Sequence, residues 1–126
     1  FPIETISIPD IKGNKANYIY SKTYTGNGKL YGYFNVPGYV SNPPDYVNDK
    51  SMQTFEIDVY NKTVKKMNFD GTTGWSCSQC KAGDYMVFGM ASTQGTGYYL
   101  YNYKEDKYEP LKIKTEGNPF KIQYLK

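Results

Sequence analysis

Apolar residues recur at every second position in short runs along the chain, which is the pattern of half-buried β-strands. These runs predict strands over residues 18–22, 30–36, 54–60, 64–69, 75–80, 85–91, 98–103 and 108–113. Two further alternating runs, 5–9 and 120–124, flank them. No window of a dozen residues has helical periodicity free of glycine, proline or β-branched runs, so the sequence predicts an all-β fold.

The predicted strands occur twice in the same order. Residues 28–36 match 83–91, and the strands that follow also match, with a long loop at 37–51 in the first copy alone. Self-similarity over about 40–55 residues with four strands per unit is typical of β-propeller blades. We therefore expect two four-stranded antiparallel blades in repeat units of about 14–71 and 72–117, plus flanking strands. A β-sandwich of two similar sheets is the alternative.

Residues 1–126 have the length of a single all-β unit. A propeller needs about four to eight blades, and two blades alone would leave large apolar faces exposed. The strand order, with one closing strand before the two units and one opening strand after them, predicts the C-terminal part of a larger propeller. We expect the remainder of that propeller chain as a partner, and a removed leader or a longer parent chain, because the sequence starts at Phe1.

The composition is rich in aromatic residues and poor in catalytic bases. The chain has 15 Tyr, 6 Phe and 1 Trp, and its 15 basic residues are all Lys against 12 Asp and Glu. Without Arg or His, it lacks the bidentate fork that reads bases and phosphates, the usual general base and the commonest metal ligand. We expect no nucleic-acid partner, no metal and no cofactor. No apolar run is long enough for a transmembrane helix.

Two cysteines form the tightest constellation of chemically active residues. Cys77 and Cys80 are spaced as in redox pairs and zinc half-sites, but the chain offers no further Cys and no His to complete a zinc site. Strand alternation puts the two side chains on opposite faces unless a bulge intervenes. A local disulfide, two free buried thiols and redox chemistry remain as alternatives.

Candidate acids and bases are numerous but unpaired. The carboxylates that could serve are Asp45, Asp49, Glu56, Asp58, Asp70, Asp84, Glu105, Asp106, Glu109 and Glu116. A glycosidase needs two of them across a cleft, and no spacing designates a pair. Clustering of Asp45, Asp49 and Asp70 around a cleft would favour an enzyme. We expect no catalytic residue.

The predicted binding surface lies at one end of the blades. The long loop 37–51 connects the second and third strands and shares an end with residues 92–96 and with the segments before residues 75 and 120. Aromatic side chains there suit sugar rings, aryl groups or a partner protein. The predicted ligand-binding residues are Tyr39, Tyr46, Trp75, Tyr98 and Lys50. Packing of the tyrosines over the loop base, and of Trp75 in the core, is the alternative.

The pattern of strand, polar turn with Lys-Thr or Asp-Lys, strand and Gly in residues 55–71 and 99–117 resembles the blade repeat of bacterial β-propellers. The richness in Tyr, Lys and Asn without Arg is similar to secreted or surface-anchored propeller lipoproteins of Bacteroidota. This resemblance implies a location at the outer-membrane surface or outside the cell, with the periplasm as an alternative, and an outer-membrane partner protein.

The predicted function is therefore non-enzymatic: a binding or scaffold module that captures a glycan, a siderophore-like molecule or a partner protein through its loop face. The alternatives are a propeller-type glycan hydrolase or lyase, whose carboxylates would converge from several blades, and a structural subunit of an outer-membrane complex.

Overall fold

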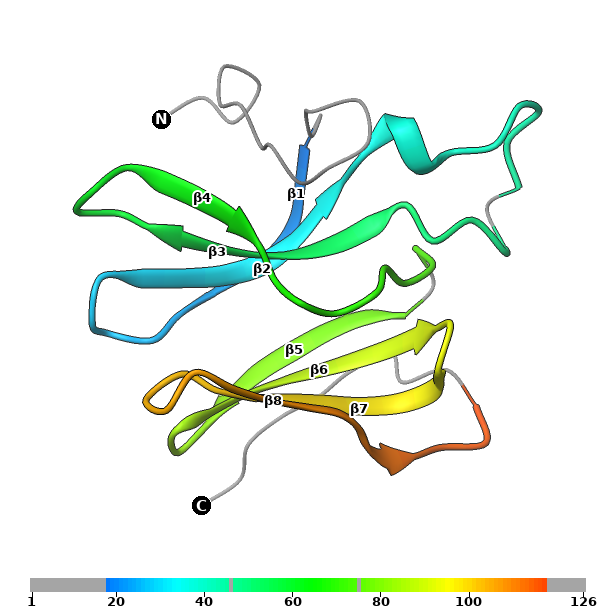
Figure 1. The fold of residues 1–126 in the computed structure, drawn as a ribbon. Helices are drawn as coiled ribbons and strands as arrows, with labels where there is room; N and C mark the ends of the chain where they lie inside the picture. Colours follow the sequence, from blue (N-terminus) through cyan, green and yellow to red (C-terminus); the bar gives the residue numbers. More distant parts are fainter. Residues whose placement is uncertain (1–17, 46, 75, 118–126) are drawn as a thin grey trace.

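The computed structural model describes residues 18–45, 47–74 and 76–117. These residues form eight β-strands in two four-stranded antiparallel sheets, one above the other in Figure 1. The short 3-10 turn Pro37–Tyr39 is the one helical segment among them. The all-β prediction and the two four-stranded antiparallel sheets are confirmed. The predicted flanking strands 5–9 and 120–124 lie outside the described residues.

Each sheet is a simple meander in which neighbouring strands in the sequence pair with each other. The first sheet contains β1 (Tyr18–Tyr24), β2 (Lys29–Asn35), β3 (Met52–Asp58) and β4 (Thr63–Lys66). The second contains β5 (Cys77–Ala82), β6 (Tyr85–Ser92), β7 (Gly95–Asn102) and β8 (Lys107–Lys114). Each of the eight predicted strands in this region overlaps an observed one, with ends displaced by up to three residues.

The last hairpin of each sheet has the same turn. In the first sheet, Asp58 pairs with Thr63, and its side-chain oxygen accepts the backbone N–H groups of Tyr60 and Asn61. The second sheet repeats this with Asn102, which pairs with Lys107 and whose side-chain oxygen accepts the backbone N–H groups of Lys104 and Glu105. Asp and Asn favour this turn because their short side chains hydrogen-bond the backbone two and three residues ahead.

The fourth residue of each turn, Lys62 in the first copy and Asp106 in the second, has a positive φ, 56° and 53° respectively. Two copies of one sequence pattern have thus adopted one backbone conformation.

The main core lies between the two sheets. Alternation on β2 sends Tyr31 and Tyr33 toward the second sheet, and alternation on β6 sends Met86, Phe88 and Met90 toward the first. The hydroxyl of Tyr33 donates to the backbone oxygens of Ser78, at 2.9 Å, and Gly89, at 3.2 Å. This buried phenol therefore joins the sheets through hydrogen bonds as well as packing.

A smaller cluster occupies the opposite face of the first sheet. Its buried members are Phe34, Val36, Phe55 and Ile57, and the rings of Phe34 and Phe55 stack with centroids 4.4 Å apart. The central strands of the first sheet, β2 and β3, are therefore buried on both faces.

Residues 67–76 connect the outermost strand of the first sheet, β4, to β5. Thr72 pairs with Met52, while its hydroxyl oxygen accepts from the backbone N–H of Ala91 at 2.8 Å. The hydroxyl of Ser92 donates to the oxygen of Gly71 at 2.8 Å. The connection is therefore fixed to both sheets at the end that also carries the loop between β2 and β3. No helix in the described part of the chain has the length and apolar character needed to cross a membrane.

Candidate functional site

A cavity of about 260 Å³ opens where the connection 67–76 meets the second sheet. Its described lining consists of Asn68, Phe69, Asp70, Ser92, Gln94, Tyr99, Tyr108 and Pro110. The first three follow β4, Ser92 ends β6, Gln94 belongs to the turn between β6 and β7, and the last three lie on β7 and β8. Ser92 and Gln94 are therefore at the end of the sheets that carries the loop between β2 and β3, on the right in Figure 1, and the rest of the lining continues from there along β7 and β8.

Aromatic rings form one wall of the cavity. The ring of Phe69 meets those of Tyr99 and Tyr108 nearly at right angles, with centroids 5.8 Å and 5.0 Å away. Phe69 and Tyr99 are buried, and Tyr99 also donates a 2.5 Å hydrogen bond to the oxygen of Gly95. Edge-to-face packing of this kind fixes ring positions. The aromatic wall is therefore already ordered without a ligand.

Polar groups form the other side. The carboxylate of Asp70 accepts a short hydrogen bond from the hydroxyl of Thr93, which ties the connection to the turn between β6 and β7. The side chains of Asn68 and Gln94 are exposed at the rim. Amide groups both donate and accept, whereas an ionised carboxylate only accepts. The rim can therefore bind a ligand that carries several hydroxyl or amino groups.

The phenols of the cavity remain neutral at physiological pH. Burial raises the pKa of Tyr99, and the negative charge of Asp70 raises it further. Burial also raises the pKa of Tyr108, against a smaller opposing effect of the hydrogen bond from the backbone of Asn68. Asp70 is the single charged residue in the described lining. The hydrolysis of a glycosidic bond by two carboxyl groups would need a second acid facing Asp70 across the cavity.

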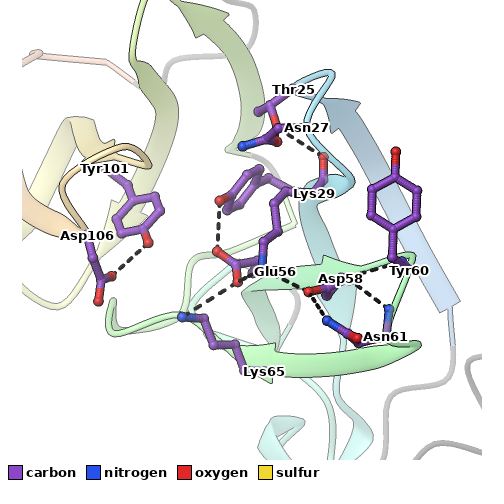
Figure 2. Close-up of polar contacts among 11 residues, drawn as sticks. Thr25, Asn27, Lys29, Glu56, Asp58, Tyr60, Asn61, Lys65, Tyr101 and Asp106 are labelled. Carbon is purple, nitrogen blue, oxygen red and sulfur yellow. Dashed lines mark hydrogen bonds and ion pairs between the residues drawn. The ribbon is translucent and has the colours of Figure 1, made fainter.

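A second polar cluster lies between the sheets and adjoins the cavity, since the rings of Tyr101 and Tyr108 have centroids 4.6 Å apart (Figure 2). Glu56 is buried; its carboxylate accepts a hydrogen bond from Tyr31 at 2.7 Å and pairs with the amino groups of Lys29 and Lys65 at 3.4 Å and 3.6 Å. Across from it, Tyr101 donates to Asp106 at 2.7 Å. These carboxylates are neutralised or hydrogen-bonded by the protein itself, which is the arrangement of a structural network. Among the described residues, no three potential ligands gather into a metal site.

Of the residues predicted for ligand binding, the three that the structure describes are not part of the cavity lining. Tyr39 packs against the Phe34 cluster, and Lys50 offers its backbone oxygen to the side-chain amide of Gln53. Tyr98 stands on the other face of β7 from Tyr99, opposite Gly89 and Ile113. Tyr46 and Trp75 lie outside the described residues.

The loop carboxylates do not converge on the cavity either. Oδ2 of Asp49 accepts the backbone N–H groups of Ser41 and Asp45, and Asp45 in turn accepts from Asn48. Both carboxylates thus hold their own loop together, and of the three acids whose clustering would favour an enzyme, Asp70 alone is in the described lining.

Cys77 and Cys80 are both free thiols in the structure, so the disulfide alternative is not formed there. Cys77 is buried, with its thiol 3.1 Å from the oxygen of Thr73, and burial raises its pKa to about 12. Cys80 is half-buried, three positions further along β5, where alternation places it on the other face of the sheet.

The sequence contained a partial signal for the cavity. Phe69 is the last residue of the predicted strand 64–69, and Asp70, one of the candidate acids, follows it directly. Tyr99 and Tyr108 belong to the predicted strands 98–103 and 108–113. What the pattern could not supply is the fold of residues 67–76, which brings these side chains together.

No family model matches this chain, and the comparisons with curated proteins and with solved structures found no match.

Proposed function

We propose that this chain is a non-enzymatic binding module of a β-propeller that captures a glycan at the bacterial surface, either outside the cell or on the outer membrane. The observation that carries the proposal is the cavity between the connection 67–76 and the second sheet, with its aromatic wall and polar rim. A propeller lipoprotein of the Bacteroidota type remains the proposed setting, with an outer-membrane protein as partner.

The arrangement of the sheets supports the propeller. The hydroxyl of Ser21 on β1 donates to the oxygen of Cys77 on β5, and the amide of Gln79 donates to the oxygen of Tyr31. The first strands of the two sheets therefore lie close together, and the chain passes from the outermost strand of one sheet to the first strand of the next. Successive propeller blades have this connection and a shared orientation around the axis.

The cavity supports a carbohydrate as the ligand. Its volume of about 260 Å³ is below the roughly 300–1,000 Å³ of pockets for drug-sized ligands, so it suits one sugar unit better than a siderophore. Half-buried Tyr108 can pack on the apolar face of a sugar ring, whereas Phe69 and Tyr99 are only 4% and 1% exposed, and Phe69 supports Tyr108 from the core. The hydroxyl groups of the sugar need donors and acceptors such as Asn68, Asp70 and Gln94. The rigid wall lowers the cost of ordering the site on binding.

Isothermal titration with a panel of monosaccharides and disaccharides tests the proposal. Wild-type protein should bind at least one sugar, and the double variant Asn68→Ala, Gln94→Ala should weaken that affinity about tenfold or more, since each lost hydrogen bond is worth about 1 kcal/mol. Lys104→Ala, an exposed change in the turn between β7 and β8, serves as control and should bind normally. Absence of binding to every sugar, or equal binding by both variants, would contradict the proposal.

A further inference from the structure

The charge of the cavity points to a narrower class of ligand. Asp70 brings one negative charge to a lining whose other described members are neutral. No ion pair joins Asp70 to another described residue. The hydroxyl of Thr93 donates a hydrogen bond to Oδ2 of Asp70, and no described residue donates one to Oδ1. The carboxylate thus faces the cavity with acceptor capacity left over.

The lysine at the end of the preceding strand is outside the described lining. This residue, Lys66, directs its amino group to the backbone oxygens of Met67 and Phe69, at 3.3 Å and 3.1 Å. The chain as a whole carries a net charge of +3, and at Tyr108, where burial raises the pKa, the positive charge of Lys65 acts to lower it. The negative charge is therefore confined to the side of the cavity that carries Asp70. Local charge of this kind selects among ligands of similar shape.

The aromatic wall adds to the same preference. Rings attract cations to their faces through the ring quadrupole, and this attraction grows as the cation loses water. Of the three rings in the lining with Asp70, Tyr108 is half-buried and has accessible surface, while Phe69 and Tyr99 are buried. The phenol of Tyr108 is uncharged at mildly acidic pH, as any tyrosine is. A carboxylate beside neutral aromatic rings favours an ammonium group over a neutral or anionic substituent.

We propose that the cavity selects an amino sugar in its protonated form, with the ammonium group on Oδ1 of Asp70 and the sugar ring against Tyr108. This inference rests on the proposed carbohydrate function and names the charge of its ligand. An N-acetylated sugar of the same ring loses the charge and adds bulk at the same position. Free amino sugars and their N-acetylated counterparts are therefore the discriminating pair.

The experiment titrates a glucosamine dimer and its N-acetylated counterpart into three proteins at mildly acidic pH, where carboxylates are ionised and amino sugars protonated. Wild-type protein should bind the free amino sugar about tenfold more tightly. Asp70→Asn keeps the size of the side chain and an acceptor for Thr93, and should abolish this preference. Asp84→Asn removes the same charge from an exposed turn at the other end of the second sheet and should retain it.

The two proposals fail in different ways. Equal affinity for both sugars in wild-type protein, or tighter binding of the acetylated one, overturns the selection of a cation and leaves the carbohydrate site in place. Preference that survives in Asp70→Asn overturns the role of that carboxylate. Failure of wild-type protein to bind either dimer or any sugar of the wider panel overturns both proposals.

Discussion

The hydroxyl of Tyr31 donates a 2.7 Å hydrogen bond to the carboxylate of Glu56, directly opposite it on the neighbouring strand, and both residues are buried. Lys29 and Lys65 supply two positive charges to the same carboxylate. Burial of a carboxylate costs free energy unless the group is paired and hydrogen-bonded. The hydrogen bond from Tyr31 therefore offsets part of the cost of burying Glu56.

Removal of the phenol hydroxyl tests this dependence. Tyr31→Phe should lower the free energy of unfolding by about 1–3 kcal/mol, since a buried charged acceptor loses a partner while packing is retained. Urea unfolding followed by fluorescence measures the change. Tyr60→Phe is the matched control, because Tyr60 is 75% exposed, and its effect should stay within about 0.5 kcal/mol. Equal effects of the two substitutions would contradict a special role for the Tyr31–Glu56 bond.

The turn after β3 predicts a pH dependence. Hydrogen bonds from the backbone and side chain of Asn61, with a further contribution from Lys29, lower the pKa of Asp58 to about 2. Because this pKa is below the ordinary value of about 3.9, the contribution to stability is present above about pH 4 and is lost as the pH falls toward 2. Asp58→Asn should therefore show a smaller loss of urea midpoint over this range than wild-type protein.

Asn is a fair replacement at this position, since Asn102 occupies the equivalent site in the second sheet and caps its turn in the same way. The variant should consequently fold, and its midpoint at neutral pH should lie below that of wild-type protein. Parallel pH profiles of the two proteins would show that the carboxylate of Asp58 contributes nothing to acid unfolding.

Alternation predicted the two sheets well because a strand repeats every two residues and its signal is local. Residues 85–91 match β6 to within one residue. The same periodicity separates Tyr98 from Tyr99 but does not say which of them faces the other sheet. Tyr98 is the residue predicted at the binding rim, whereas Tyr99 is in the cavity lining. Which of the two tyrosines lines the cavity depends on how residues 68–70 pack against the second sheet. Such long-range packing has no local pattern in the sequence.

The two cysteines should differ in reactivity. Cys77 is 7% exposed and its pKa is raised to about 12, whereas Cys80 is half-buried with a pKa that burial raises as well. Because the thiolate is the reactive species, iodoacetamide should modify Cys80 first in the folded protein and both residues only in denaturant. Mass spectrometry of digested protein assigns the sites. A mass that rises by two hydrogens on reduction of the unreduced protein would instead establish the disulfide.

The glycine in the middle of β2 marks where the two copies differ. A β-bulge in β1, between Ile19 and Ser21, brings the backbone oxygen of Ser21 to 2.2 Å from where a Cβ on Gly32 would lie. The second copy has Val87 at the corresponding position, and its β5–β6 register is regular. The bulge therefore occupies the space that a side chain occupies in the other sheet.

Gly32→Ala should destabilise the protein by about 3 kcal/mol, because the clash is with backbone and no side-chain rotation relieves it. Gly74→Ala is the control, since nothing lies within 4 Å of its added Cβ, and its effect should be within about 0.5 kcal/mol. Thermal and urea unfolding of both variants measure the difference. If Gly32→Ala were as stable as wild-type protein, the bulge would have to shift without cost, and β1 would pair with β2 in the regular register of the second sheet.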